Sequence, residues 1–247
     1  MSLLIAIPVY NEHRTVGQVL DKVLQYHPDV LVVDDGSSDG TREILEARSG
    51  IRLIRHPVNR GYGRSVIDAF EYADRHGFDW VITMDCDEQH EPESIPDFVR
   101  EIATGRWDLI SGSRYLRPRA DDDLPPGERR TVNTTITAIL NSLLPLKLTD
   151  AFCGFKAHRT VAMMRLRLDD PGYAFPMQLW PRAAKAGLRI TEIPVRLIYN
   201  DPNRHFGGLL DDASYRLKHY LDVIRGELDR PAPEPAGEPL CSGCGCG

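Results

Sequence analysis

Short apolar runs alternate with amphipathic stretches through the first half of the chain. The runs are rich in β-branched residues, which is typical of buried strands, whereas the stretches between them repeat apolar residues at helical spacing. Strands are expected at Leu3–Val9, Val30–Val33, Ile51–Ile54, Trp80–Met84 and Leu109–Ile110, with helices around 16–24, 62–73 and 95–102. This order predicts an α/β fold with a mostly parallel sheet and helices on both of its faces. Such sheets bind their ligands at the carboxyl ends of the strands.

The pattern changes after residue 112. Residues 113–130 are dense in charge and contain three prolines, which predicts a long mobile loop. The mostly uncharged segment 131–148 predicts an apolar helix, which either is buried or lies against a membrane surface or an acyl chain. A strand is expected over 188–199 and a last helix over 209–224.

The end of the chain has a different composition. From Glu227 onward it holds four prolines and four glycines and almost nothing to bury, which predicts a disordered tail over 227–247. Three cysteines of this tail, Cys241, Cys244 and Cys246, lack the fourth ligand of a zinc module. We therefore expect a single domain over 1–226.

Composition excludes several classes of protein. With 30 basic and 36 acidic residues, the chain of 247 residues has a net charge of −6, which argues against nucleic acid as a partner. No apolar run is long enough to span a membrane, and the first residues lack the basic region of a signal peptide. The scattered Cys86 and Cys153 form no disulfide framework, so the expected location is cytoplasmic. The sequence leaves a homo-oligomer open.

Two adjacent carboxylates, Asp34 and Asp35, follow the second expected strand and precede a glycine turn. Either Ser38 or Asp39 is expected to cap the helix that follows. A solvated turn would explain that cap, but not two carboxylates side by side, because like charges repel. Asp35 is therefore predicted to accept hydrogen bonds from a base or a ribose.

A second acidic string, Asp85-Cys86-Asp87-Glu88-Gln89, follows the fourth expected strand. In an extended segment, residues two apart project to the same side, so Asp85 and Asp87 could reach one cation together. Oxygen ligands and substrate phosphates favour Mg²⁺ or Mn²⁺, and zinc would need more nitrogen or sulfur ligands. A polar loop without a metal is the alternative.

Two further segments could meet phosphate. Asn59–Arg64 superficially resembles a dinucleotide-binding fingerprint but follows the third strand and lacks the third glycine at the right offset. The helix start there, with Arg60 and Arg64, could still receive the negative charge of a nucleotide. Arg114, past the fifth expected strand, could do the same.

Seven motifs occur in an order that resembles family 2 glycosyltransferases of the GT-A fold, in particular the polyprenol-phosphate mannosyltransferase (dolichyl-phosphate mannose synthase) branch. They are IPVYNE, VVDDGSSDGT, NRGYGRS, ITMDCDEQH, ISGSRY, TDAFCGFKAHR and GYAFPMQLWPRA, within roughly residues 3–200. The resemblance implies inverting transfer of a hexose from a nucleotide sugar, GDP-mannose or UDP-glucose, with Mg²⁺ or Mn²⁺ as cofactor. The implied acceptor is a polyprenyl phosphate, which would bring the protein to the cytoplasmic face of a membrane as a peripheral partner.

The resemblance also assigns residues. The implied nucleoside pocket consists of Pro8, Tyr10, Glu12, Val33 and Asp35. Asp85, Cys86, Asp87 and Gln89 would surround the metal and the diphosphate, with Asp85, Asp87 and Gln89 as metal ligands and Asp87 as a catalytic residue. Arg114 would face the phosphates.

The chain departs from the family pattern at two places, both of which concern the acceptor. Gln178 stands where relatives have a carboxylate, and residues 200–208 leave only Arg204 and His205 in place of a more basic segment. If the acceptor is a sugar hydroxyl, a general base is needed, and Asp150 is the candidate. A transferase with a soluble acceptor and a nucleotide-sugar-binding protein without turnover are the alternative functions.

Overall fold

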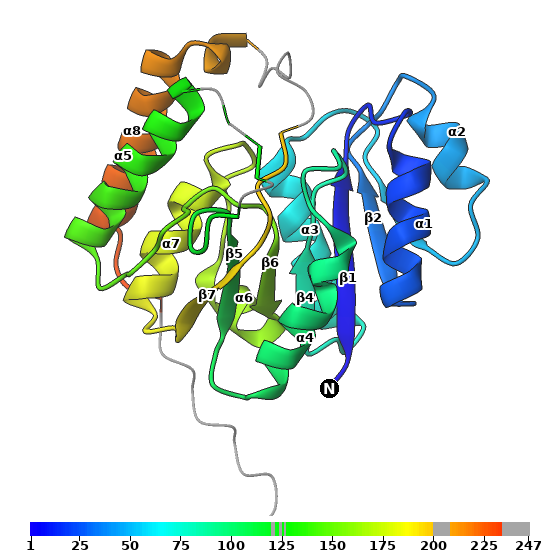
Figure 1. Cartoon of the computed structure of the whole chain (residues 1–247), viewed down its shortest axis with the longest axis horizontal. Helices are drawn as coiled ribbons and strands as arrows, with labels where there is room; N and C mark the ends of the chain where they lie inside the picture. The colour runs from blue at the N-terminus through cyan, green and yellow to red at the C-terminus, as the bar shows by residue number, and fades with distance from the viewer. Residues whose placement is uncertain (120–121, 124, 126, 200–207, 234–247) are drawn as a thin grey trace, which may run out of the picture.

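Seven strands form one sheet, with helices on both of its faces (Figure 1). The computed structural model describes residues 1–119, 122–123, 125, 127–199 and 208–233. The strands are β1 (Leu3–Val9), β2 (Val30–Asp34), β3 (Arg52–Arg55), β4 (Trp80–Thr83), β5 (Leu109–Ser113), β6 (Lys156–Arg159) and β7 (Ile190–Pro194). The helices are α1 (Val16–Tyr26), α2 (Thr41–Glu46), α3 (Tyr62–Arg75), α4 (Ile95–Ala103), α5 (Gly127–Leu143), α6 (Thr160–Leu166), α7 (Phe175–Lys185) and α8 (Ala213–Asp229), with short 3₁₀ turns η1 (Pro92–Ser94) and η2 (Gly208–Asp211).

The strand order is β3-β2-β1-β4-β6-β5-β7. Strands β1 to β4 are mutually parallel, and β5 is parallel to β7, whereas β6 lies antiparallel between β4 and β5. The carboxyl ends of β1, β2, β4 and β5 therefore lie at the same edge of the sheet as the start of β6. Loops from both halves of the chain meet at that edge.

The alternation of side chains along β1 divides the core into two layers. Leu4 and Ala6 pack with α3, α5, α6, α7 and α8, whereas Leu3, Ile5 and Ile7 pack with α1, α2 and α4. Since successive side chains of a strand point to opposite faces, a strand that is apolar at every position must be covered on both. The predicted mostly parallel sheet is confirmed in this form.

Several predicted bounds are wrong in the second half of the chain. Strand β6 and helices α6 and α7 were not predicted, and the strand expected over 188–199 is only five residues long. Helix α5 begins at Gly127, inside the segment expected to be a loop, and ends at Leu143 rather than at 148.

In the first half, the N-cap of α2 is Gly40, with a φ of +98°, and not Ser38 or Asp39. The Asp39 carboxylate does accept the N–H of Thr41 at 3.1 Å.

The boundary predicted at residue 226 falls inside α8. Glu227 is only 3% exposed, and its carboxylate accepts hydrogen bonds from Arg182 Nε at 2.8 Å and Gln178 Nε2 at 2.8 Å. The Gln178 amide oxygen in turn accepts the N–H groups of Asp169 and Asp170, so this side chain ties α7 to α8. Gln178 thus stands where the family pattern has a carboxylate, and it contacts the carboxylate of Glu227. The two residues are far apart in the sequence, so a local pattern could not reveal this contact.

Replacing Glu227 by alanine should destabilise the fold, because it leaves the nearly buried Arg182 guanidinium with only the longer carboxylate contact, of 3.5 Å to Asp169. We expect the free energy of unfolding to fall by about 3 to 5 kcal/mol. Urea denaturation measures it, with Asp222→Ala, an exposed carboxylate on the same helix, changing it by less than about 0.5 kcal/mol. Equal effects of the two variants would contradict the structural role of Glu227.

Candidate active site

A cavity of about 410 Å³ opens at the edge of the sheet where the loops meet. Most of the residues predicted for the site line it, although they come from four separate strand ends. These are Pro8, Tyr10, Glu12, Asp35, Asp85, Cys86, Asp87, Gln89 and Arg114. Parallel strands bring the segments that follow them to one edge, so this convergence follows from the topology.

Two predicted residues of the nucleotide-sugar site lie away from the cavity. Val33 is fully buried in the sheet opposite Pro8 and does not line the cavity. The Arg64 guanidinium pairs with Asp68 and with Glu71 one and two turns further along α3, at 2.9 Å from Glu71 Oε1, rather than facing the cavity. Arg204 lies outside the residues that the structure describes, as does His205.

Asp85 and Asp87 lie in a loop and not in an extended segment, because β4 ends at Thr83. The expected strand geometry is therefore wrong, although both carboxylates line the cavity. Glu88 has a φ of +60°, and His90 Nδ1 accepts the N–H of Asp85 at 3.0 Å, which closes the loop. Gly154 lies close beside it, and a Cβ there would displace the Asp85 carboxylate from its present position.

The carboxylate oxygens of this loop suit a hard divalent cation whose remaining ligands are waters and substrate phosphates. Two carboxylates reach the cavity, and no group of three or more His, Cys, Asp or Glu suited to a metal occurs among the described residues. Mg²⁺ commonly binds through one or two carboxylates, with waters and substrate phosphates completing its shell. The Gln89 Nε2 atom is buried without a hydrogen-bond partner, and an N–H group suits a phosphate oxygen better than a metal.

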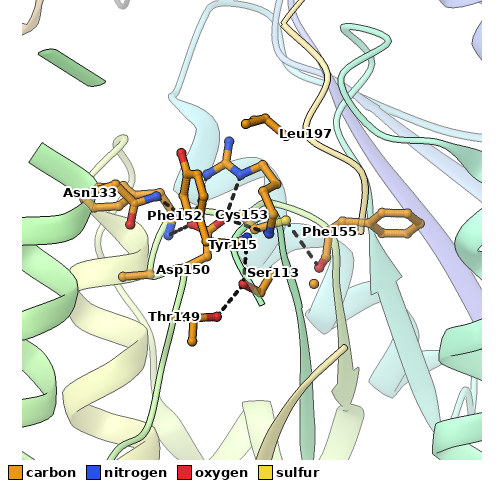
Figure 2. A network of polar contacts seen from close by, with 12 residues as sticks. Ser113, Tyr115, Asn133, Thr149, Asp150, Phe152, Cys153, Phe155 and Leu197 are labelled. Atoms are coloured by element: carbon orange, nitrogen blue, oxygen red, sulfur yellow. Dashed lines mark hydrogen bonds and ion pairs between the residues drawn. The ribbon is translucent and has the colours of Figure 1, made fainter. Parts of the chain in front are cut away.

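Arg114 and Asp150 form an ion pair at the end of β5, in which the Asp150 side chain is fully buried and that of Arg114 is partly exposed. Figure 2 shows Asp150 together with Asn133, Ser113 and Thr149. Arg114 Nε lies 2.6 Å from Asp150 Oδ2, and a second guanidinium nitrogen lies 3.0 Å from Oδ1. Asn133 Nδ2 on α5 donates to the same carboxylate at 2.7 Å, and the backbone N–H of Phe152 donates at 3.1 Å. Ser113 and Thr149 join the two segments by a hydrogen bond of 2.5 Å between their hydroxyls.

These contacts do not fit Asp150 as a general base. The side chain is fully buried, is absent from the cavity lining and has both oxygens occupied. Burial would raise the pKa of Asp150, but the Arg114 charge and the hydrogen bonds from Arg114 and Asn133 hold it well below its usual range. The same pair raises the pKa of Arg114 although burial opposes it. Asp150 therefore orients a guanidinium that is permanently charged.

A group of cations in the cavity was missed by the sequence predictions. Arg129 of α5, Arg216 of α8 and Lys156 of β6 all line it. Arg216 is 3% exposed and pairs with Glu128 at 2.6 Å, while burial lowers the pKa of Lys156, whose ammonium lies 5.4 Å from the Trp180 ring centre. Basic residues scattered over two helices and a short strand leave no local motif, so only their assembly reveals them.

Comparisons with known proteins identify the family. Residues 4–167 match the model of "Glycosyl transferase family 2". An undecaprenyl-phosphate mannosyltransferase of Micrococcus luteus is 30% identical, over 92% of this chain and 97% of that protein. A polyprenol monophosphomannose synthase of Mycolicibacterium smegmatis is 28% identical, over 92% and 89%.

Solved structures share the fold. The glucosyl-3-phosphoglycerate synthase of Mycobacterium tuberculosis, solved with UDP, has a TM-score of 0.68 at 20% identity and covers 93% of this chain and 81% of its own. The TarS protein of S. aureus, solved with UDP-GlcNAc, has a TM-score of 0.58 at 17% identity, over 93% and 72%. The chain has the GT-A fold.

The chain belongs to glycosyl transferase family 2 and is an enzyme that uses a nucleotide-sugar donor. Within residues 1–119, 122–123, 125, 127–199 and 208–233, none of the helices has the length and apolar character needed to cross a bilayer.

The Arg114–Asp150 pair should make stability depend on pH. Because the folded-state pKa of Asp150 lies below its ordinary value, the carboxylate contributes stability above about pH 4 and loses it as the pH falls further. Asp150→Asn should therefore unfold more easily than wild type at neutral pH, and the difference should shrink at about pH 3. Urea titrations at both pH values measure this, with Asp222→Asn as an exposed control. A difference that grows on acidification would contradict it.

Proposed function

We propose that this glycosyltransferase transfers a hexose from GDP-mannose or UDP-glucose to a polyprenyl phosphate, with inversion at the anomeric carbon and with Mg²⁺ or Mn²⁺ as cofactor. One observation carries the proposal: a single cavity joins carboxylates from the strand ends to guanidinium groups and apolar side chains of α5 and α8. The names of the relatives from Micrococcus luteus and Mycolicibacterium smegmatis, which cover most of the chain, support the acceptor class.

The donor nucleoside is assigned to the side of the cavity formed by β1 and β2. Asp35 is an acceptor there for an N–H or O–H group of a base or ribose, and Pro8, Tyr10 and Glu12 form the neighbouring wall. Val33 would act only indirectly, because it pairs with Pro8 within the sheet. Cys86, which is 3% exposed, lies between Asp85 and Asp87 in the sequence, and its side chain packs into the hydrophobic core.

Asp85 and Asp87 are the residues that would hold Mg²⁺ or Mn²⁺, since both line the cavity. Among the described residues, no group of three or more His, Cys, Asp or Glu side chains could hold a metal instead. When bound, the cation would neutralise charge on the departing nucleoside diphosphate. Gln89 would donate its amide N–H to a phosphate oxygen, because this buried donor has no partner among the residues that the structure describes. Structures of the glucosyl-3-phosphoglycerate synthase with Mg²⁺ or Mn²⁺ and UDP are consistent with such a cofactor on this fold.

The acceptor is assigned to the side formed by α5 and α8. Arg114, Arg129 and Arg216 would bind its phosphate, because guanidinium groups form paired hydrogen bonds with phosphate oxygens. Val132 and Tyr220, which also line the cavity, offer apolar contacts to the first isoprene units.

A phosphate acceptor also fits the lack of a base. A phosphate monoester is largely ionised at neutral pH, so its oxygen can attack the anomeric carbon without a proton acceptor. Asp150 then has no proton to remove, and its role is to orient Arg114. Because a polyprenyl chain lies in a membrane, the proposal places the enzyme at a cytoplasmic membrane face as a peripheral protein.

Asp87→Ala should abolish metal-dependent transfer, since one carboxylate cannot hold the cation against the diphosphate. We expect the metal-stimulated rate to fall at least about 100-fold. Initial rates with and without added Mn²⁺ measure this, and Glu93→Ala, an exposed carboxylate in the turn before α4, is the matched control. An Asp87 variant with wild-type rates would remove the metal assignment.

Radiolabelled donor distinguishes the acceptor classes. With a polyprenyl phosphate in detergent, label should pass into an organic-extractable product, and Arg129→Ala should raise the KM for the lipid about tenfold because a charged hydrogen bond is lost. Arg225→Ala, an exposed arginine on α8, should leave it unchanged. Transfer only into aqueous products would favour a soluble acceptor, and donor binding without transfer or hydrolysis would favour a binding protein.

A further inference from the structure

His56 is a buried histidine whose two ring nitrogens both contact carboxylates. It follows β3 directly and is 5% exposed. Its Nδ1 lies 2.6 Å from Asp35 Oδ1, and its Nε2 lies 2.7 Å from Asp68 Oδ2 on α3. Its backbone N–H donates to the Asp34 carbonyl at 2.9 Å, which fixes the residue against β2. The ring therefore connects the end of β2 to helix α3.

Both ring nitrogens must donate for these two bonds to form together. An ionised carboxylate only accepts, and a neutral imidazole has a single N–H, so the arrangement requires the doubly protonated ring. The neighbouring charges favour ionised carboxylates. Burial raises the pKa of Asp68, but hydrogen bonds from Arg64 and His56 lower it overall, and Arg60 lies 3.7 Å from the same carboxylate.

Asp35 is held in one orientation by three donors. Its Oδ1 accepts from His56 and from the Arg60 N–H at 2.8 Å, and its Oδ2 accepts from the Gly61 N–H at 2.8 Å. Gly61 cannot shift freely, because it has a φ of +99° and a Cβ there would collide with the Pro171 carbonyl. Oδ2 thus retains capacity for one more hydrogen bond, on a carboxylate that lines the cavity.

We propose that His56, held in its doubly protonated form by Asp68, is a positioning residue that presets Asp35 for the donor nucleoside. This inference rests on the proposed function, in which Asp35 contacts the nucleotide. His56 itself does not line the cavity, so it acts through Asp35 alone. The charged groups around the ring are Asp35 after β2, Asp68 and Arg64 on α3, and Arg60 in the loop before α3.

The arrangement depends on both N–H groups of the ring. With only one N–H, one ring nitrogen would present a lone pair to a carboxylate, and that contact would be repulsive. Because Asp68 and Asp35 would then compete for the remaining N–H, the orientation of Asp35 would be less well defined. Donor affinity should therefore depend on the ring contact with Asp35.

The test measures binding of UDP and of GDP, each with Mg²⁺, by calorimetry, together with kcat and KM for transfer. His56→Gln should weaken binding of whichever nucleotide the wild type binds, and raise the donor KM, about tenfold with kcat nearly unchanged. Asp68→Asn should keep wild-type affinity, because the new amide can donate to a neutral ring whose Nδ1–H still reaches Asp35. Glu71→Gln, which removes the charge of the other acidic partner of Arg64 on the same helix, is the control and should change neither.

The outcomes separate the two proposals. Failure of the wild type to bind either nucleotide would overturn the proposed function and this inference with it. Wild-type binding that His56→Gln leaves intact would overturn the inference alone. The same would follow if Asp68→Asn or Glu71→Gln lost as much affinity as His56→Gln.

Discussion

The buried ion pair between Arg114 and Asp150 connects more of this structure than any other polar contact described above. It joins the end of β5 to the segment that leads into β6, and Asn133 brings α5 to the same carboxylate. The Glu192 carboxylate of β7 accepts the backbone N–H groups of Thr149 and Asp150 at 2.8 and 3.1 Å, which fixes these two residues against β7. A guanidinium can remain in so enclosed a place only while its carboxylate is present, because an unpaired buried charge is costly.

This constraint also divides the cavity by charge. Asp35, Asp85 and Asp87 lie on the side of β1, β2 and β4, whereas Arg114, Arg129 and Arg216 lie toward α5 and α8. A diphosphate beside three carboxylates would be repelled without a cation, while a phosphate on the other side would meet guanidinium groups, two of which are paired with Asp150 and Glu128. The two halves of the proposed reaction thus need different electrostatic partners, and the buried pair keeps the second half in place.

The strands and helices of the first half were predictable because their signal is local. In β1 every side chain except the partly exposed Pro8 is buried, and acidic residues follow the apolar runs, so Asp35, Asp85 and Asp87 could be found from their position alone. Strand β6 escaped prediction because its residues, Lys-Ala-His-Arg, lack both apolar character and alternation. It is a strand because β4 and β5 bond to it on both sides, which is a tertiary effect.

The sequence by itself determined the family, the kind of sheet and the acidic loops at its edge, since these depend on short runs of neighbouring residues. Only the tertiary structure decided which charges meet. Asp150 is paired with Arg114, and Glu227 is a buried partner of Arg182 instead of part of a tail. Partners separated by 36 or 45 positions leave no local pattern, because the free energy of a buried charge depends on what the fold places beside it.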